Sequence, residues 1–485
     1  MIEFQDVSFS YPDSAYGGLR HIDLTIPSGQ CVLLCGRSGC GKTTLTRLIN
    51  GLIPQFFAGE LSGRILLDGE DLSNLPMYHI AEKVGSVFQN PRTQFFNVDT
   101  DGEIAFGMEN EAVPQEQLRQ RVAETAAALH IEPLLGRSIF ALSGGEKQKI
   151  AFASVYAMNP EVYLLDEPSS NLDRATIGEL QSHLKLIHSQ GKTVIVAEHR
   201  LYYLMDVADR ILYLENGRIA GDWTPEQFRA LPVETRRRMG LRAMDLQEET
   251  PIFFPPSSAK PMLEIQNAAL LYQKQPVLQN LSLQAAPGDV IAVVGHNGAG
   301  KTTFSRALCG LHREASGSFL WNGKPQTAAA RRKRAYMVMQ DVNYQLFAES
   351  VEAECTFGIR HPDAGLAAKT LDELGLAPFR ERHPNTLSGG QKQRLAAATA
   401  MVCQKDMLVF DEPTSGLDYD SMVRLAALVR KLSAAGKILF IVTHDYEFVC
   451  RTCTRVLHLD GGGIRDDLCI TEETLPKIKE ILQVR

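Results

Sequence analysis

The sequence has few cysteines, no surplus of basic residues and no long hydrophobic run. Nine cysteines among 485 residues are too sparse for a disulfide scaffold and indicate a reducing compartment. The 50 lysines and arginines are outnumbered by 57 aspartates and glutamates, so the net charge of −7 gives no support to a nucleic-acid-binding protein. No apolar run approaches the ~20 residues of a membrane-spanning helix, and the first residues lack the basic start and apolar stretch of a secretory signal. We therefore expect any membrane role to come from a partner.

The residues that are present have the composition of an ordinary globular protein and contain an internal repeat. Hydrophobic residues make up 44% and charged residues 22% of the chain. From Ser143 onward the two copies keep a constant offset of 245 positions (388 − 143). The first copy is 8 residues longer between Lys42 and Gln89 (47 against 39) and 6 longer between Gln89 and Ser143 (54 against 48), and we expect these differences in surface segments. Three motifs occur twice: Gly36–Thr44 as Gly295–Thr303, Leu142–Gln148 as Leu387–Gln393, and Leu164–Pro168 as Val409–Pro413.

The repeat divides the chain into two domains joined by a linker. The segment from Pro251 to Pro261 holds four prolines in eleven positions, which neither a helix nor a central strand tolerates. The run Arg236–Arg238 just before it is predicted to form a solvated helix end. The predicted boundaries are residues 1–235 for the first domain, 236–261 for the linker and 262–485 for the second domain.

Each domain is predicted to have an α/β fold. Short apolar runs such as Cys31–Cys35, Thr193–Ala197 and Val290–Val294 are typical of strands buried on both faces of a parallel sheet. Helical segments lie between these runs, and this alternation defines the α/β class.

Both copies contain the pattern G-x-x-x-x-G-K-[ST], which predicts a phosphate-binding loop. Glycines let the backbone curl so that successive N–H groups point at phosphate oxygens, and the following helix adds its positive N-terminal end. Lysine is expected to reach the terminal phosphates and threonine to place a hydroxyl on Mg²⁺. A glycine loop without a ligand is the alternative, but two matches, each between a strand and a helix, argue against it. The predicted binding residues are Gly36, Ser38, Gly39, Gly41, Lys42, Thr43 and Thr44 in the first copy, and Gly295, Asn297, Gly298, Gly300, Lys301, Thr302 and Thr303 in the second.

A pair of carboxylates ends an apolar strand in each copy. Asp166 and Asp411 are predicted to hold Mg²⁺ through water, because the end of such a strand lies beside the phosphate loop. Glu167 and Glu412 are predicted to orient or deprotonate the attacking water. Two exposed carboxylates at a strand end are the alternative, which the matched distance from two glycine loops disfavours.

The third repeated motif, Leu-Ser-Gly-Gly-x-Lys-Gln, predicts a second anion site in each copy. The serine is expected to cap a helix whose N–H groups face a ligand, and the glycines allow close approach. One nucleotide in one domain does not need two such surfaces, whereas a head-to-tail pair of domains would use both. A plain helix cap is the alternative. The predicted residues are Ser143, Gly144 and Gly145, and Ser388, Gly389 and Gly390.

With these motifs the chain resembles the ATP-binding cassette (ABC) ATPases over nearly all of its length outside the linker. The resemblance implies two tandem P-loop NTPase domains, each with a mainly parallel core sheet, an antiparallel β subdomain and a helical subdomain, and it implies ATP and Mg²⁺ as ligands. A core role is the alternative for the two tyrosines that it singles out. The roles that it implies by position are adenine stacking for Tyr11 and Tyr272, contact with Mg²⁺ and the transport partner for Gln89 and Gln340, communication between sites for Asp173 and Asp418, and contact with the γ-phosphate for His199 and His444.

A narrower resemblance follows the two glutamines. Val87–Phe96 and Val338–Phe347 share the spacing Q-x-x-x-x-Q-[FL]-F, which resembles the energy-coupling-factor importers of vitamins and transition-metal ions. In that family the segment lines the groove that receives the coupling helices of a membrane subunit. Val342 departs from the usual proline. The expected docking residues are Gln94, Phe95 and Phe96, and Gln345, Leu346 and Phe347.

The sequence therefore predicts the ATPase subunit of a bacterial importer, peripheral on the cytoplasmic face of the membrane, with integral-membrane partners and no nucleic acid. The first site would combine the first glycine loop with Ser388–Gly390, and the second site the second loop with Ser143–Gly145. Two alternatives stay open: a soluble twin-cassette ATPase acting on ribosomes, and a twin-cassette sugar importer. We expect the substrate to be recognised by another protein.

Two further features of the sequence involve cysteines. Cys40 lies inside the first glycine loop beside a helix N-terminus and Lys42, and it is expected to be a reactive thiolate if it is exposed. The single C-x-x-C of Cys450 and Cys453 has no second pair, and a structural role is expected for it.

Overall fold

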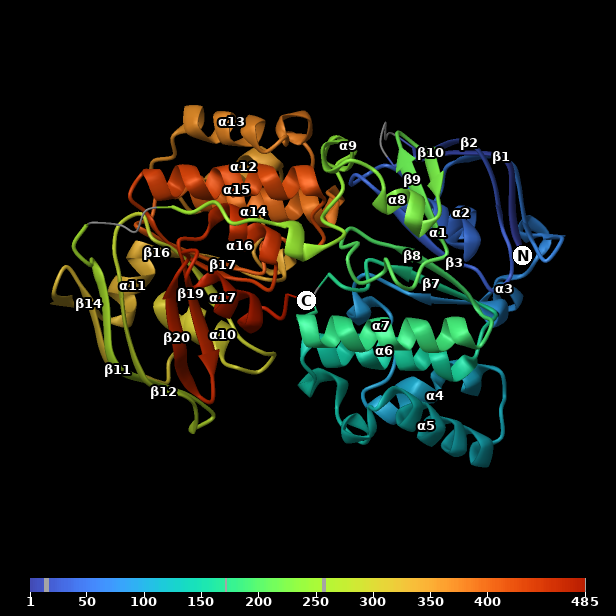
Figure 1. Ribbon diagram of the computed structural model, residues 1–485, viewed down its shortest axis with the longest axis horizontal. Helices are drawn as coiled ribbons and strands as arrows, with labels where there is room; N and C mark the ends of the chain where they lie inside the picture. The colour runs from blue at the N-terminus through green and yellow to red at the C-terminus, as the bar shows by residue number, and fades with distance from the viewer. Residues whose placement is uncertain (13–16, 171, 255–258, 485) are drawn as a thin grey trace. The chain divides into compact units, whose positions relative to one another are not determined.

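The computed structural model describes residues 1–12, 17–170, 172–254 and 259–484. The chain divides into two compact units, Met1–Met244 and Asp245–Arg485 (Figure 1). Asn171, and Pro255 and Pro256 of the predicted linker, lie outside the described residues. None of the described helices combines the length and apolar character needed to cross a membrane.

The main sheet of the first unit has six strands in the order β10-β9-β3-β8-β7-β6. All neighbours pair in parallel except β10, which pairs antiparallel with β9. The order places β3, which carries the first glycine loop, next to β8 and one strand away from β7. The strands are β3 (Cys31–Gly36), β6 (Val84–Val87), β7 (Val162–Asp166), β8 (Thr193–Ala197), β9 (Arg210–Glu215) and β10 (Arg218–Trp223).

A second, antiparallel sheet of the first unit has the order β2-β1-β4-β5. Its apolar side chains pack with Val32 and Leu34 of β3, whereas Cys31, Leu33 and Cys35 of the same strand belong to a different buried cluster. Successive side chains of β3 therefore enter two cores, which explains its continuous apolar run. The strands are β1 (Ile2–Ser10), β2 (Leu19–Ile26), β4 (Glu60–Leu67) and β5 (Glu70–Asp71).

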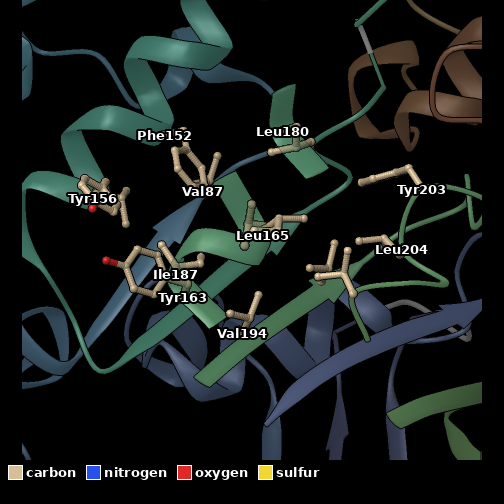
Figure 2. Packing of buried hydrophobic residues seen from close by; sticks show 14 of the residues in the cluster. Val87, Phe152, Tyr156, Tyr163, Leu165, Leu180, Ile187, Val194, Tyr203 and Leu204 are labelled. Carbon is tan, nitrogen blue, oxygen red and sulfur yellow. The ribbon is translucent and has the colours of Figure 1, made fainter. Parts of the chain in front are cut away.

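Helices cover the other face of the main sheet. Figure 2 shows Phe152 of α6, Leu180 of α7 and Leu165 of β7 in the cluster between these helices and the sheet. The same cluster includes Ile104 of α4 and Val122 of α5, so these two helices share the core. Buried residues of α1, α2 and α3 instead belong to the cluster shared with the antiparallel sheet. The helices of the first unit are α1 (Lys42–Ile49), α2 (Leu52–Gln55), α3 (Met77–Lys83), α4 (Thr100–Asn110), α5 (Gln115–Leu129), α6 (Gly144–Met158), α7 (Arg174–Ser189), α8 (Pro225–Arg229) and α9 (Val233–Arg238).

The second unit repeats this topology. Its main sheet has the order β16-β17-β18-β13-β19-β20, and its antiparallel sheet the order β12-β11-β14-β15. The predicted α/β fold, with a mainly parallel core sheet, an antiparallel sheet and a set of helices in each domain, is confirmed. The strands are β11 (Leu263–Tyr272), β12 (Gln275–Ala285), β13 (Val290–Val294), β14 (Ala315–Trp321), β15 (Lys324–Pro325), β16 (Ala335–Val338), β17 (Met407–Asp411), β18 (Ile438–Val442), β19 (Arg455–Asp460) and β20 (Gly463–Cys469).

The two units differ in their helices. The helix α12 has 6 residues where α4 has 11, and α13 has 10 where α5 has 15, so the six-residue difference between the copies falls in this helical layer. The helix α16 follows His444, whereas the segment after His199 forms turns. The helices of the second unit are α10 (Lys301–Leu308), α11 (Ala328–Arg334), α12 (Val351–Thr356), α13 (Ala364–Glu373), α14 (Gly389–Val402), α15 (Tyr419–Ala434), α16 (Tyr446–Thr452) and α17 (Leu475–Ile481).

Much of the predicted linker is packed against one unit or the other. Arg236 is only 6% exposed, which corrects the expectation of a fully solvated arginine run. Arg37 of the first glycine loop donates to the carbonyl of Arg238 at 2.5 Å, so α9 belongs to the first unit. In the second unit the amide of Ile252 donates to the carbonyl of Cys450 at 2.8 Å. Arg238 and Ile252, on either side of the boundary between Met244 and Asp245, are therefore each hydrogen-bonded within their own unit.

Candidate active sites

The two glycine loops lie between a buried strand and a helix in each unit. The loop residues Gly36 and Gly295 have φ of +143° and +152°, and a Cβ on either would approach a neighbouring carbonyl oxygen to 2.3 Å. Gly41 and Gly300 begin α1 and α10 with φ of +111° and +90°. These positions need glycine, because L side chains rarely adopt such backbone angles. The glycines of the motif therefore determine the tight backbone conformation of both loops.

A buried lysine donates hydrogen bonds to backbone carbonyls of each glycine loop. The ammonium of Lys42 donates to the carbonyls of Gly36 at 3.0 Å and Arg37 at 3.2 Å, and lies 3.4 Å from Nε2 of His199. Lys301 donates to the corresponding carbonyls, that of Gly295 at 2.7 Å and that of His296 at 3.0 Å. Both lysines are less than 10% exposed. Each loop therefore holds one positive charge at the first turn of its helix, where an anion would bind.

A threonine and an aspartate meet at each site. The hydroxyl of Thr43 donates to Oδ1 of Asp166 at 3.3 Å, and that of Thr302 to Oδ2 of Asp411 at 3.2 Å. Burial and the neighbouring charge of Glu167 raise the pKa of Asp166 to about 6, and burial also raises the pKa of Asp411. A cation beside these carboxylates would offset that cost, and hydroxyl and carboxylate oxygens are ligands that Mg²⁺ accepts.

The same residues line an open hollow. Thr43, Asp166 and Gln89, together with Arg47 and Phe57, border a space of about 420 Å³. Among the residues that the structure describes, no cluster of three or more His, Cys, Asp or Glu side chains could hold a metal alone. A Mg²⁺ ion at this place would therefore take most of its ligands from water and from a bound nucleotide, as this ion usually does.

The two predicted catalytic glutamates have an unusual backbone. Glu167 and Glu412 have φ of +46° and +48°, in the left-handed region that residues other than glycine rarely adopt. Their amides donate to the carbonyls of Ala197 at 2.8 Å and Val442 at 2.9 Å, which anchors each turn at the end of its strand. Strain held in place in this way is common at functional sites.

Side chains converge on the glutamate in both units, but not equally. Oε2 of Glu167 accepts from Nε2 of Gln89 at 2.6 Å, and its Oε1 lies 3.4 Å from Nε2 of His199. In the second unit Nε2 of His444 lies 3.6 Å from Oε1 of Glu412. Gln340 is exposed there, and no hydrogen bond among the described residues joins it to that glutamate. The structure thus brings the predicted glutamate and histidine together in both copies, and the glutamine only in the first.

The repeated serines begin long helices. Ser143 accepts from the amide of Glu146 at 3.3 Å, and Oε2 of Glu146 accepts from the amide of Ser143 at 2.7 Å, so the pair forms a capping box at the start of α6. Ser388 and Gln391 form the same box at the start of α14. Among the described residues, no hydrogen bond joins either serine to the glycine loop of its own unit. The adjacent Gly144, Gly145, Gly389 and Gly390 form the first turns of these helices.

The remaining predicted residues have mixed surroundings. Asp173 and Asp418 are buried N-caps of α7 and α15, and each accepts from a backbone amide at 2.8 Å. The hydroxyl of Tyr11 contacts Oγ1 of Thr44 at 3.2 Å, which ties its ring to the helix after the loop. Tyr272 is 59% exposed at the end of β11. The two tyrosines therefore do not present equivalent faces to a ligand.

The loops after the two glutamines hold a recurrent latch. Oε1 of Gln94 accepts from the amide of Phe88 at 3.3 Å, and Oε1 of Gln345 from the amide of Met339 at 2.6 Å. Each bond closes the loop onto the residue that precedes Gln89 or Gln340. The glutamine side chains that we expected to contact a partner, Gln94 and Gln345, therefore form hydrogen bonds within their own loops.

The aromatic residues at the tips of these loops are the exposed ones. Leu346 is 8% exposed and Phe95 packs against the core, which corrects the expectation that they face a partner. Phe96 and Phe347, the next residues, are 74% and 67% exposed. Phe96 stacks on Phe106 with ring centroids 4.8 Å apart. Sequence alone did not distinguish adjacent apolar residues, because their orientation depends on the loop conformation.

A groove of about 310 Å³ lies beside Phe96 in the first unit. Its lining is largely apolar and comes from segments far apart in the sequence, including Phe56 after α2, Met77 of α3 and Met158 of α6. Sequence analysis missed Phe56 and Met77, because neither residue belongs to a repeated motif.

Cys40 is buried at 6% exposure, beneath the first glycine loop. Its sulfur would lie 2.8 Å from a Cβ built on Gly36, so the thiol faces the loop's interior. The condition on which its expected reactivity depended, exposure of the thiol, is not met.

Comparison with known proteins identifies the family. The ABC transporter family model matches residues 19–170 and 278–415, one range in each unit. A Treponema denticola protein provisionally named an ABC transporter ATP-binding protein is 50% identical over 97% of both chains. A Methanosarcina acetivorans protein of the same provisional name is 33% identical over 96% of this chain and 85% of its own. The structure titled ribosome-bound archaeal Pelota and ABCE1 shares the fold, with a TM-score of 0.70 over 98% of this chain and 80% of that one, at 20% identity.

These matches confirm the predicted resemblance to the ABC ATPases. They cover both repeats, and both glycine loops, both repeated serines and both predicted catalytic glutamates lie inside the matched ranges. ABC transporter ATP-binding proteins are ATPases that bind ATP. The chain therefore belongs to the ABC transporter ATP-binding family, as an ATPase with two cassettes fused in one polypeptide.

Proposed function

We propose that this chain is the ATPase subunit of an energy-coupling-factor-type importer, lying on the cytoplasmic face of the membrane and driving uptake of a vitamin or a transition-metal ion through separate membrane subunits. The observation that carries the proposal is the latch that recurs in both units. A glutamine fixes the loop and the aromatic residue two positions later, Phe96 or Phe347, remains exposed. Exposed aromatic residues on ordered loops are typical anchors for a partner.

In each site the residues have separable roles in moving the γ-phosphoryl group to water. Lys42 is positioned to neutralise phosphate oxygens from the base of the loop. Glu167 accepts a proton or a hydrogen bond from the attacking water, while Gln89 and His199 fix its carboxylate. Thr43 and Asp166 would hold Mg²⁺, which supplies charge neutralisation of the phosphates when bound. Lys301, Glu412 and His444, with Thr302 and Asp411, take these roles in the second copy.

We further propose that the two sites are composite. Site one joins the first glycine loop, Gly36–Thr44, to Ser388–Gly390, and site two joins Gly295–Thr303 to Ser143–Gly145. The capping boxes support this arrangement, since each leaves the N-terminal end of a long helix without a hydrogen bond to its own loop. Closure on two ATP molecules and reopening after hydrolysis would then move the attached membrane subunits. Asp173 and Asp418, which cap helices at the ends of the glutamate turns, are the proposed link between the sites.

The groove of the first unit supports docking of a membrane partner. Its apolar lining suits one face of an amphipathic helix, the common occupant of such grooves. The aromatic pair of Phe96 and Phe106 forms one wall.

The alternatives differ in testable ways. A ribosome-acting twin-cassette ATPase would carry a long charged helical linker, whereas residues 245–254 hold only a short 3₁₀ turn, at Leu246–Glu248. The likeness to the ribosome-bound structure, at 20% identity, concerns the fold. A twin-cassette sugar importer would show a degenerate catalytic set in one copy, whereas both copies pair the glutamate with the histidine.

Purification of the tagged chain from its own cells tests the proposal. The proposal predicts that integral-membrane proteins co-purify from detergent-solubilised membranes, among them a small substrate-binding component whose ligand is a vitamin or metal ion. Co-sedimentation with ribosomes, with no membrane protein attached, would contradict it. Recovery with a sugar-binding importer complex would support the second alternative.

A further inference from the structure

The carboxylate of Glu198, directly before His199, is the most densely hydrogen-bonded side chain near the first site. It is 2% exposed. Its Oε1 accepts from the amides of His199 at 2.7 Å and Arg200 at 3.1 Å. Its Oε2 accepts from the amide of Ser169 at 3.2 Å and from the hydroxyl of Tyr203 at 2.9 Å. Four donors therefore converge on one buried carboxylate, as burial of such a group requires.

These bonds join two segments that both carry catalytic groups. Ser169 lies two residues after Glu167, in the turn that follows β7, and Glu198 follows β8. Arg200 adds a second tie, because its guanidinium donates to the carbonyls of Ser169 at 3.1 Å and Leu172 at 3.5 Å. The segment so held leads directly to Asp173. Hydrogen bonds of the Glu198 and Arg200 side chains therefore hold the turn after Glu167 against the segment that carries His199. Neither Glu198 nor Arg200 is among the residues predicted to act on ATP.

Tyr203 connects this network to the core. It belongs to the buried cluster beneath the main sheet, as does its neighbour Leu204 (Figure 2). Its hydroxyl is directed at Glu198 while its ring is buried. The carboxylate is thus held from one side by backbone amides and from the other by a rigid aromatic side chain.

Among the described residues, the second unit keeps only one hydrogen bond of this network, that from the amide of residue 445 to the side chain of residue 443. At the offset of 245, Glu198 corresponds to Thr443, Ser169 to Thr414, Arg200 to Asp445 and Tyr203 to Phe448. The hydroxyl of Thr443 accepts from the amide of Asp445 at 3.1 Å, and Phe448 has no hydroxyl to donate where Tyr203 donates to Glu198. Asp445 instead caps α16, which has no counterpart in the first unit.

We propose that Glu198 is a positioning residue of the first site, which holds His199 and the Glu167 turn in their working geometry, and that the second site works without such a brace. The two sites then turn over unequally, with the first preorganised before ATP binds. The hydrogen bond from Gln89 to Glu167, absent between Gln340 and Glu412 among the described residues, points the same way. The inference rests on the proposed function, because it takes His199 and Glu167 as groups that act on the γ-phosphate.

The test measures single-turnover ATP hydrolysis in a Glu412→Gln chain, where only the first site retains its glutamate. Glu198→Thr with Tyr203→Phe gives the first unit the second unit's residues. We expect the single-turnover hydrolysis rate to fall about tenfold and the Kd for ATP to change less than about twofold, because the lost hydrogen bonds orient groups that act in the transition state. Glu198→Gln, which keeps the volume and one acceptor oxygen, should restore part of the rate.

A matched control comes from the second copy. Thr443→Val in a Glu167→Gln chain removes one hydroxyl from the equivalent position and should change the second site's rate less than about twofold. Thermal unfolding of each variant separates lost folding from lost positioning, and Glu198→Gln decides the outcome if the double substitution does not fold.

Three results would overturn the inference: an unchanged rate in the folded Glu198 variants, an equal loss of ATP affinity and rate, or an equally large effect of Thr443→Val. Failure of the proposed function gives a different result. In that case a chain with both Glu167→Gln and Glu412→Gln would still hydrolyse ATP.

Discussion

At the residue scale, the proposed catalytic groups are fixed by backbone features that the motifs encode. The left-handed φ of Glu167 and Glu412 recurs after the same strand in both units, and so does the contact between threonine and aspartate. Local sequence predicted these residues because strand, turn and loop follow each other within a few positions. It did not predict the Glu198 network, since a lone glutamate before a histidine shows no sign of the donors that fold around it.

The buried carboxylate of Asp166 gives a stability prediction. Burial and the charge of Glu167 raise the pKa of Asp166 to about 6, above the unfolded value near 4, so ionisation destabilises the folded chain at neutral pH. Asp166→Asn should raise the free energy of unfolding at pH 7.5 by on the order of 1–2 kcal/mol, measured in chelator without nucleotide. The gain should shrink as pH falls through about 6 and vanish below about 4, where the carboxyl is protonated in both states.

The same variant should lose nearly all ATP hydrolysis by the first site, because Asn supplies no charge for Mg²⁺. Thr43→Ser, which keeps the hydroxyl, is the control for disturbance of the site. An Asp166→Asn chain that is less stable than wild type across this pH range would show that the carboxylate is compensated in the folded state.

Cys40 gives a reactivity prediction. Its burial beneath the loop should make alkylation by iodoacetamide at least about tenfold slower than alkylation of Cys469, the exposed cysteine. Peptide mass spectrometry of the native chain over time measures both. Cys40→Ala, which copies Ala299, should retain ATPase activity. Equal rates at the two cysteines would show that the loop opens and exposes the thiol.

At the element scale, the residues that fix the conformation of each loop after Gln89 and Gln340 differ from the residues that the loop exposes. Gln94 and Gln345 close their loops, Leu346 is buried, and Phe96 and Phe347 remain outside. The helix starts at Ser143 and Ser388 were predictable, because a capping box is a local pattern. The burial of Arg236 was not, since it depends on packing within the first unit. Arg331 is likewise buried, and its guanidinium lies 3.7 Å from the centroid of the Phe319 ring.

The exposed aromatic residues should anchor the membrane partner. Phe96→Ala with Phe347→Ala should detach the chain from its membrane subunits, each truncation costing ~1–3 kcal/mol of binding, while ATP binding is retained. A pull-down of membrane subunits and a nucleotide-binding assay on the same protein measure both effects. Phe140→Ala is the control, because Phe140 is 79% exposed but lies outside the lining of the groove.

Leu346→Ala should behave differently from the exposed anchors. Because Leu346 is buried, its truncation should lower the free energy of unfolding by about 2–4 kcal/mol and affect docking only through lost folding. Full assembly with both Phe96 and Phe347 truncated would place the docking surface elsewhere and remove the main support for the energy-coupling-factor proposal.

At the scale of the whole molecule, the chain contains two cassettes of the same fold, and corresponding site residues in the two cassettes have different neighbours. The constant offset after Ser143 predicted two equivalent domains, and the sheet orders bear this out. The differences lie where the sequence offset changes or where substitutions act together, as in the helical layer and at the segment after each histidine. Such differences depend on several side chains at once and could not be predicted from motifs.

The two glutamates should both contribute to turnover. Glu167→Gln or Glu412→Gln alone should each remove a large part of steady-state ATPase activity if the sites are coupled, and the double variant should lose about 10²-fold or more and retain bound ATP. Phosphate release and nucleotide retention are measured on the three variants. Unchanged turnover in the Glu412→Gln chain would show that the second site is not hydrolytic.

The central proposal is that each ATP site joins the glycine loop of one unit to the serine of the other. The most direct measurement is photolabelling by 8-azido-ATP in the Glu167→Gln/Glu412→Gln chain, with peptide mapping to identify the labelled unit. The account predicts that Ser388→Arg removes most labelling from the unit that contains Lys42, and that Ser143→Arg removes it from the unit that contains Lys301. Loss of labelling from the unit that carries the substituted serine would contradict the account, because each site would then be complete within its own cassette.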